Sequence, residues 1–329
     1  MASPIDKINK LLKKDIAFTG KTTREKIDSL STGIISLDYI LGNGGFPKGR
    51  VVDINGLSST GKSSLCLHTI AEAQKKGITC AYIDAEYSFI LKHAQKLGVN
   101  TDELIIIQPD SGEEAFEAME ILIKEKVGVI VVDSVSALSP RAEIEAEIGK
   151  PQMGSQARLV SQGLRRLMSP ISKNNTVVLF INQMRQNIMG GRYNPYIVAG
   201  GMALKFYSSI RLEMKRTAVL SLDNKQLGHT IEFHTAKNKV FEPNKRCSVK
   251  YFLDGGFEKE GNIFEIAEEA EVLTRKGNTY YFGDTKIAIG KEKAAEALMT
   301  DSDLRQQILD SLLSYEQSQK KESKQSKQD

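Results

Sequence analysis

A glycine-rich stretch near residue 60 has the residue types and spacing of a phosphate-binding loop. Four residues separate Gly56 from Gly61, and Lys62 and Ser63 follow at once, in the run NGLSSTGKSS. In such a loop the backbone N–H groups surround phosphates, the lysine reaches the β- and γ-phosphates, and the hydroxyl ligates Mg²⁺. An apolar strand precedes the loop and a helical pattern follows it, which is the context that the motif requires. The stretch predicts a nucleoside triphosphate site with Mg²⁺, formed by Gly56, Leu57, Ser58, Ser59, Thr60, Gly61, Lys62, Ser63 and Ser64.

Acidic residues follow two other apolar runs. Asp133 ends the run VIVVD, where a carboxylate beside a phosphate loop can hold the metal through water. Glu86 and Asp84 both stand at the end of the run AYIDAE, and strand alternation points them the same way. Either carboxylate can polarise a water for attack on the γ-phosphorus, and periodicity alone does not choose between them.

Two loop-like segments favour contacts with a polyanion. The strand TVVLFINQ is predicted to end in the amides Asn182 and Gln183, and some sixteen residues with four glycines and few regular signals follow. Long irregular loops in compact domains are usually functional. A second segment follows Asp133, and beyond it Arg158, Ser161, Arg165 and Arg166 fall at helical spacing. These arginines are either a solvated helix face or a row of phosphate contacts.

The elements that must position these residues alternate between apolar strands and helices. Strands are predicted over 49–56, 79–86, 128–134 and 176–183, with helical patterns between them. This order predicts an α/β fold with a mostly parallel central sheet and helices on both faces. The runs SIRLEMKR and TIEFHTAKNK suggest an antiparallel extension, residues 5–14 a short amphipathic helix, residues 259–315 a small C-terminal α/β lobe, and residues 316–329 a disordered polar tail.

Composition excludes several classes of protein. The 329 residues are 40% hydrophobic and 26% charged, with no apolar run long enough to span a membrane and no secretory leader pattern. Three scattered cysteines and four histidines show no metal-ligand spacing. The expectation is a cytoplasmic protein without a membrane partner, and its net charge of +4 permits a nucleic-acid partner.

Together these motifs closely resemble the bacterial RecA recombinase family. The resemblance runs over about residues 31–257 through GLSSTGKSS, CAYIDAE, VIVVDSVSALSPRAEIEAEIG, FINQMR and KNKVFEP, and the stretch ALKFYSSIR is specific to that family among phosphate-loop proteins. It implies a RecA-like ATPase core over residues 31–258 that binds ATP and Mg²⁺, preceded by a polymerisation helix and linker over 1–30. It also implies that the lobe is DNA-associated.

The resemblance assigns further roles by position. Glu86 matches the catalytic glutamate, and Gln183 the glutamine that senses the γ-phosphate. Lys237 and Lys239 match lysines that reach the ATP of a neighbouring subunit, in the manner of arginine fingers. Residues 143–154 and 184–199 match two loops that line the DNA axis of the filament. The DNA contacts implied are Arg158, Ser161, Arg165, Arg185, Ile188, Gly200 and Gly201.

Some positions depart from the family pattern, as in a divergent member of the kind that phages carry. His93 replaces a tyrosine near the adenine, where its ring can stack on the base. Arg192 and Tyr193 stand where the family tends to have Phe-Gly, and they add a charge and an aromatic ring suited to single-stranded DNA.

The resemblance implies an ATP-dependent recombinase that polymerises into a helical filament on single-stranded DNA, pairs it with homologous duplex DNA and exchanges strands in repair and recombination. Mediator proteins and a self-cleaving repressor are further partners that it suggests. A ring-forming DNA motor or a KaiC-like ATPase of the same fold is the first alternative. The second, a non-enzymatic DNA-binding paralogue, conflicts with the complete set of chemical residues.

Overall fold

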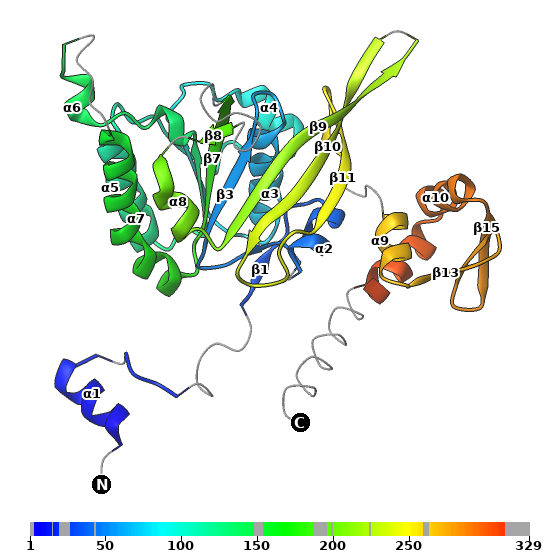
Figure 1. The fold of residues 1–329 in the computed structure, drawn as a ribbon, viewed down its shortest axis with the longest axis horizontal. Helices are drawn as coiled ribbons and strands as arrows, with labels where there is room; N and C mark the ends of the chain where they lie inside the picture. Colours follow the sequence, from blue (N-terminus) through cyan, green and yellow to red (C-terminus); the bar gives the residue numbers. More distant parts are fainter. Residues whose placement is uncertain are drawn as a thin grey trace.

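A large sheet forms the centre of the computed structural model, which describes residues 3–14, 16–19, 27–42, 44–147, 154–186, 196–198, 200–223, 225–258 and 263–312 (Figure 1). Its strand order is β12-β11-β10-β9-β3-β7-β6-β4-β5. The strands are β3 (Val51–Gly56), β4 (Cys80–Asp84), β5 (Ile105–Ile107), β6 (Val129–Asp133), β7 (Val177–Gln186), β9 (Ile210–Leu222), β10 (Lys225–Asn238), β11 (Arg246–Phe252) and β12 (Gly256–Phe257).

The strands from β9 to β5 run parallel, and β10, β11 and β12 extend the sheet in antiparallel pairs. The predicted α/β fold, with a mostly parallel centre and an antiparallel extension, is therefore confirmed. The central strands β3, β4 and β6 are buried along their whole length, which explains their continuous apolar runs. The β9–β10 hairpin projects beyond the rest of the sheet (Figure 1).

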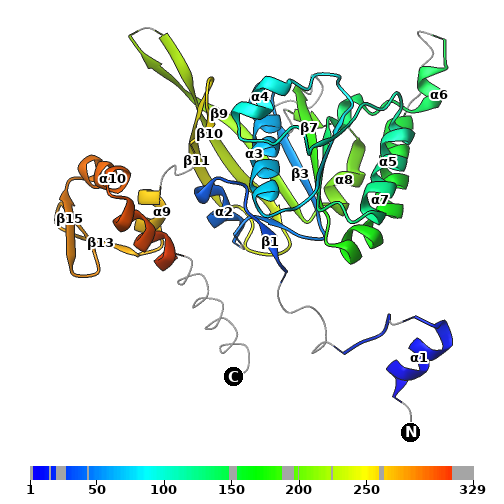
Figure 2. The ribbon, with the colours of Figure 1, turned by 180° about the vertical axis from the view of Figure 1, so that it is seen from behind.

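Helices cover both faces of this sheet, as predicted. One face packs against α2 (Ile35–Leu41), α3 (Lys62–Lys75) and α4 (Leu91–Lys96), and α3 lies in front of the sheet in Figure 2. The other face packs against α5 (Gly112–Lys124), α7 (Ser155–Asn174) and α8 (Gly201–Tyr207). A 3₁₀ turn, η2 (Val135–Ala137), and the short α6 (Arg141–Ile144) follow β6.

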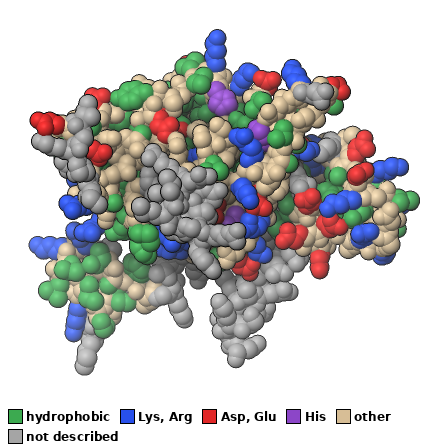
Figure 3. All heavy atoms as spheres, turned by 45° about the horizontal axis from the view of Figure 1, so that its top comes forward, with side chains coloured by type: hydrophobic (Ala, Val, Ile, Leu, Met, Phe, Trp, Pro, Cys, Tyr) green, Lys and Arg blue, Asp and Glu red, His purple; other side chains and the backbone are tan. Residues whose placement is uncertain are grey.

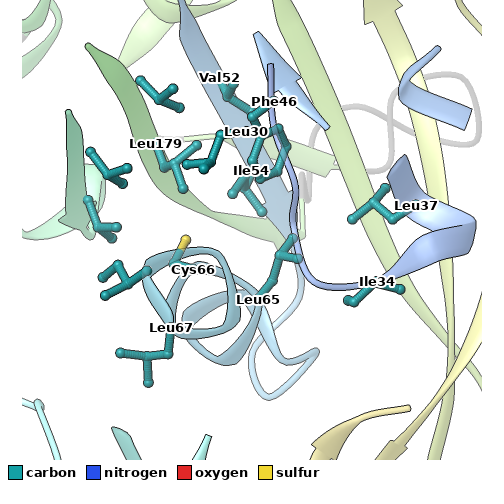
Figure 4. Close-up of a cluster of buried hydrophobic side chains, with 14 of the residues drawn as sticks. Leu30, Ile34, Leu37, Phe46, Val52, Ile54, Leu65, Cys66, Leu67 and Leu179 are labelled. Atoms are coloured by element: carbon teal, nitrogen blue, oxygen red, sulfur yellow. The ribbon is translucent and has the colours of Figure 1, made fainter. Parts of the chain in front are cut away.

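Apolar packing fixes the direction in which α3 leaves the phosphate loop. Leu65 and Cys66 are buried against the sheet, where they meet Val52, Ile54 and Leu179 (Figure 4). A fully buried leucine such as Leu65 contributes about 1.5–3 kcal/mol relative to an exposed one. The first turn of α3 is thereby held at the carboxyl end of β3.

The strand before the second predicted DNA loop is longer than the sequence suggests. We expected it to end at Gln183, but β7 continues to Gln186 and pairs antiparallel with β8 (Tyr196–Val198). The prediction of an irregular segment directly after Gln183 is therefore wrong. The backbone N–H and C=O groups of residues 184–186 pair with β8, which begins thirteen residues after Gln183. Residues 187–195 and 199 lie outside the described part of the chain.

The N-terminal helix, α1 (Pro4–Leu12), stands apart from the body of the molecule (Figure 1). Ser3 caps it by accepting a hydrogen bond from the Ile5 N–H at 3.1 Å. The apolar side chains of Ile8, Leu11 and Leu12 are exposed, and Figure 3 shows apolar side chains gathered there at the lower left. After α1, β1 (Ser29–Leu30) pairs with β2 (Phe46–Pro47) at the start of the core.

The C-terminal lobe has a core of its own. It contains α9 (Ile263–Glu269), a three-stranded antiparallel sheet and α10 (Lys291–Thr300), and residues 302–312 are helical. Its sheet is β13 (Leu273–Lys276), β14 (Thr279–Phe282) and β15 (Thr285–Ile289). The lobe packs on α2 through Ile35 and Tyr39. Among the described residues, no helix has the length and apolar character needed to cross a membrane.

Candidate nucleotide-binding site

The glycine-rich loop connects the end of β3 to the start of α3, as its sequence context predicts. Gly61 has a φ of +83°, which is left-handed backbone, and a Cβ there would lie 2.9 Å from Cζ of Phe257. A Cβ at Gly56 would lie 2.7 Å from the Met214 carbonyl oxygen. Both positions therefore require glycine, and the loop is free to bring its N–H groups and the α3 N-terminus close to an anion.

Lys62 and Ser63 occupy the first turn of α3. The Lys62 ammonium donates hydrogen bonds to the carbonyl oxygens of Leu57 at 2.8 Å and Gly56 at 3.2 Å. Its burial lowers its pKa, while Asp133 and Glu86 oppose that shift. The Lys62 ammonium is thus a cation bound by carbonyl oxygens of the loop that is predicted to hold the phosphates.

Asp133 lies beside this turn because β6 ends there. The Ser63 hydroxyl donates to Oδ2 of Asp133 at 2.7 Å. Burial raises the pKa of Asp133, and hydrogen bonds from Ser63 and Tyr82 oppose the shift. A hydroxyl and a carboxylate are the hard oxygen ligands that Mg²⁺ takes. Among the described residues, no cluster of three His, Cys, Asp or Glu could hold a metal.

Glu86 and Gln183 meet at the same edge of the sheet. The Gln183 side-chain amide donates to Oε1 of Glu86 at 2.8 Å, and the Ser134 hydroxyl donates to the same oxygen. The register aligns Gly56 with Gln183 and Asp84 with Asp133, so the carboxyl ends of β3, β6 and β4 lie together beside Gln183 of β7. A carboxylate in this position can accept a proton from a water molecule.

These groups line one cavity of about 440 Å³. Ten of the site residues predicted from the sequence line this cavity: Ser58, Ser59, Thr60, Gly61, Lys62, Ser63, Ser64, Glu86, Asp133 and Gln183. Five further lining residues were missed by sequence reasoning: Ile181 in β7, Arg216 in β9, His229 in β10, Tyr251 in β11 and Leu253 directly after β11. They are far from the loop in sequence and carry no motif. Arg216 donates to the Ser59 carbonyl at 2.6 Å, which ties β9 to the phosphate loop.

Asp84 does not share the position of Glu86, contrary to the alternation argument. Strand β4 ends at Asp84, so alternation does not extend to Glu86, which lies in the following turn. The buried Asp84 carboxylate accepts hydrogen bonds from the N–H groups of Ser88 and Phe89 and from the Gln108 amide, at 3.0–3.1 Å. These bonds make Asp84 an anchor for the turn.

His93 lies behind the phosphate loop and is not among the residues that line the cavity. Its Nε2 is 3.1 Å from the Ser64 hydroxyl, which is also 3.0 Å from the Tyr251 hydroxyl. Burial lowers the pKa of His93, with Lys96 adding to the effect. Stacking of this ring on a base therefore stays a prediction.

Lys237 and Lys239 lie far from the phosphate loop of their own chain. Lys237 pairs in register with Arg211 at the start of β9, beside the amino end of β3, whereas the loop follows the carboxyl end of β3. Both ammonium groups donate to carbonyl oxygens at the end of α8: Lys237 to Lys205 and Phe206, and Lys239 to Phe206. Burial, followed by the charge of Lys239, lowers the pKa of Lys237 to about 8.

The predicted DNA contacts are only partly described. Arg158 and Arg165 are exposed and Ser161 is half-buried on α7, while Arg166 is paired with Glu120 at 2.6 Å. Gly200 and Gly201 begin α8 with φ values of +76° and +66°. The Arg185 backbone pairs with Ile197, but its side chain, Ile188, Arg192, Tyr193, residues 148–153 and the tail lie outside the described part of the chain.

The sheet order, the loop and the carboxylates at neighbouring strand ends define a P-loop ATPase of the RecA-like class. A family model described as the RecA N-terminal domain matches residues 1–258, and the RecA C-terminal domain model matches residues 261–314. The chain belongs to the RecA family.

Relatives named Protein RecA are similar to the chain over most of its length. That of Ehrlichia chaffeensis is 45% identical over 285 residues, which cover 86% of this chain and 80% of the relative. That of Halalkalibacterium halodurans is 41% identical over 297 residues, covering 90% and 85%. That of Cereibacter sphaeroides is 44% identical over 270 residues, covering 82% and 79%. The resemblance inferred from the sequence is confirmed, and the recombinase interpretation is favoured over a ring-forming motor.

Proposed function

We propose that this protein is an ATP-dependent recombinase, which polymerises on single-stranded DNA, pairs it with homologous duplex DNA and exchanges strands. The observation that carries the proposal is the convergence of Lys62, the Ser63–Asp133 pair and the Glu86–Gln183 pair on one cavity in a chain of the RecA family. Loss of any one of these groups would have favoured a non-enzymatic paralogue.

In this proposal the phosphate loop binds ATP. Lys62 exchanges its bonds to the loop carbonyls for the β- and γ-phosphates, where its charge is complementary. Ser63 and Asp133 would hold Mg²⁺, which neutralises charge on the phosphates when it is bound. Glu86 takes a proton from the attacking water.

Gln183 is proposed to couple the nucleotide to DNA. Its amide donates to Glu86, and the segment proposed to bind DNA, residues 184–199, begins directly after it, in the last three residues of β7. A γ-phosphate that attracts the amide would draw Gln183 away from Glu86. Movement of Gln183 would then free the Glu86 carboxylate to accept a proton and would displace the segment at residues 184–199. Hydrolysis and DNA binding would thus depend on the same side chain.

Hydrolysis is proposed to require assembly. Lys237 and Lys239 lie near the amino end of β3, whereas their own phosphate loop follows its carboxyl end, and this supports the proposal that they act on the loop of another copy. There they would stabilise negative charge that develops on the phosphates. The exposed apolar side chains of α1 are the proposed contact that holds neighbouring copies together.

Single-stranded DNA is proposed to lie along the loops at residues 143–154 and 184–199. Arg158 and Arg165, exposed on α7, and the α8 start at Gly200 would contact phosphates beside them. Arg192 and Tyr193 would add one phosphate contact and one stacking surface. Mediator proteins and a self-cleaving repressor are proposed partners of the assembled filament.

The test is phosphate release from ATP with Mg²⁺, with and without single-stranded DNA. The expected result is release that rises when DNA is added and depends on protein concentration, because assembly completes the site. Lys62→Ala, purified in parallel, should show no release and reports contaminating ATPases. Equal release with and without DNA, over a range of protein concentrations, would count against a DNA-assembled ATPase.

A further inference from the structure

Tyr82 contacts the proposed metal ligand from within the core. It lies in β4, is 3% exposed, and its hydroxyl donates a hydrogen bond to Oδ2 of Asp133 at 2.5 Å. The Ser63 hydroxyl donates to the same oxygen at 2.7 Å. Two hydroxyl donors from different elements therefore converge on one carboxylate oxygen.

Apolar side chains surround the ring of Tyr82. It belongs to the core cluster on the α3 face of the sheet and lies edge-on to Phe89, with ring centroids 5.1 Å apart. A phenylalanine would fill the same space. A buried hydroxyl in apolar surroundings costs free energy unless it is hydrogen-bonded, and Asp133 supplies that bond. What distinguishes tyrosine from phenylalanine at this position is thus its contact with Asp133.

The bond also constrains the carboxylate. Hydrogen bonds from a hydroxyl to an ionised carboxylate are short and strong, and the 2.5 Å contact lies in that range. Because Tyr82 and Ser63 both bind Oδ2, neither of them occupies Oδ1. The carboxylate plane is fixed from the Tyr82 side by a rigid ring and from the Ser63 side by the first turn of α3.

We propose that Tyr82 is a positioning residue that holds the Asp133 carboxylate in the orientation needed for Mg²⁺. The inference rests on the proposed function, since it assumes that Ser63 and Asp133 serve the metal of a bound nucleotide. Residues that orient a metal ligand from behind typically change metal affinity or activity by about 10- to 100-fold when they are altered. Because Asp133 acts through water in this proposal, the lower end, about tenfold, is expected.

The test is binding of a fluorescent ATP analogue, titrated with Mg²⁺, to the parent chain and to Tyr82→Phe. The half-saturating Mg²⁺ concentration should rise about tenfold in Tyr82→Phe, while binding without Mg²⁺ is unchanged. Tyr280→Phe is a matched control, because Tyr280 is 2% exposed and donates to the Glu268 carboxylate at 3.1 Å, in the C-terminal lobe. Its Mg²⁺ requirement should equal that of the parent.

A second measurement separates positioning from a general loss of stability. In an Asp133→Asn background the added Tyr82→Phe change should leave half-saturating Mg²⁺ unaltered, because the hydroxyl acts through the carboxylate. An unchanged or lower Mg²⁺ requirement in Tyr82→Phe, or an equal increase in both backgrounds, would overturn the inference and leave the proposed function intact. A parent chain that binds the analogue with no response to Mg²⁺ would overturn both.

Discussion

Replacing Glu86 by glutamine is the substitution that isolates proton transfer from the rest of the site. Oε1 of Glu86 accepts hydrogen bonds from Gln183 and Ser134, and a glutamine oxygen can accept the same two bonds. The side chain keeps its length and partners but can no longer take a proton. General-base catalysis is worth about 10²- to 10⁴-fold in rate, or about 2.7–5.4 kcal/mol of activation free energy.

We therefore expect Glu86→Gln to bind ATP and DNA with near-parent affinity and to hydrolyse ATP about 10²- to 10⁴-fold more slowly. Single-turnover phosphate release, with the protein in excess over ATP and single-stranded DNA present, measures the chemical step directly. Filaments formed with ATP should persist in Glu86→Gln, since in the proposed function hydrolysis releases the DNA.

Asp84→Asn is the matched control, because Asp84 is a buried carboxylate two residues away. Its three hydrogen-bond donors leave no place for an amide N–H, so the change should cost about 1–3 kcal/mol in the free energy of unfolding. Hydrolysis per folded molecule should stay near that of the parent. Near-parent hydrolysis in Glu86→Gln together with loss of hydrolysis in Asp84→Asn would refute the assignment of the base.

Four further predictions follow from the site and the far edge of the sheet. Lys62→Ala should abolish hydrolysis. Lys62→Arg should bind nucleotide but hydrolyse it poorly, because a planar guanidinium does not fit a site for a point charge. Nucleotide titration and phosphate release measure both effects, and normal turnover in Lys62→Ala would contradict the prediction. Mixing Lys62→Ala subunits with subunits that carry Lys237→Ala and Lys239→Ala should restore part of the activity, and failure to do so in co-assembled filaments would exclude lysines acting between subunits. Burial lowers the pKa of Lys237 to about 8, so its positive charge is lost as the pH rises through about 8. DNA-stimulated hydrolysis should fall over the same range and the fall should be weaker in Lys237→Arg, whereas identical alkaline profiles would contradict a role for this charge. Gly61→Ala should cost about 1–2 kcal/mol for left-handed backbone plus the displacement of Phe257, which denaturant unfolding and nucleotide titration would detect; unchanged stability would be inconsistent with the +83° φ.

The parts of the site that sequence reasoning found are those encoded by local patterns. The spacing of Gly56, Gly61 and Lys62 indicates a loop whose backbone conformation few residue types can adopt. The apolar run before Asp133 indicates a fully buried strand. Parallel strands end at one edge, so the meeting of β3, β6 and β7 followed from their order. The helices on both faces followed from the same alternation.

The parts that were missed depend on contacts between distant segments. Arg216 and His229 reach the cavity because β9 pairs with β3 and β10 pairs with β9. The antiparallel extension was predicted, but no local pattern specifies that it joins the sheet beside β3. In the sequence, Tyr82 is one aromatic residue within an apolar run. Only the structure shows that its hydroxyl donates a hydrogen bond to Asp133. The extension of β7 to Gln186 was missed because a three-residue partner strand has too little pattern to be recognised.

Strand exchange tests the central claim most directly. Circular single-stranded DNA, homologous linear duplex DNA, Mg²⁺ and the protein are incubated with and without ATP, and the products are separated by electrophoresis and viewed by electron microscopy. Joint molecules and exchanged duplex should form only with ATP, together with open helical filaments on the single strand. ATP-dependent closed rings on the DNA without any joint molecules would contradict the central claim.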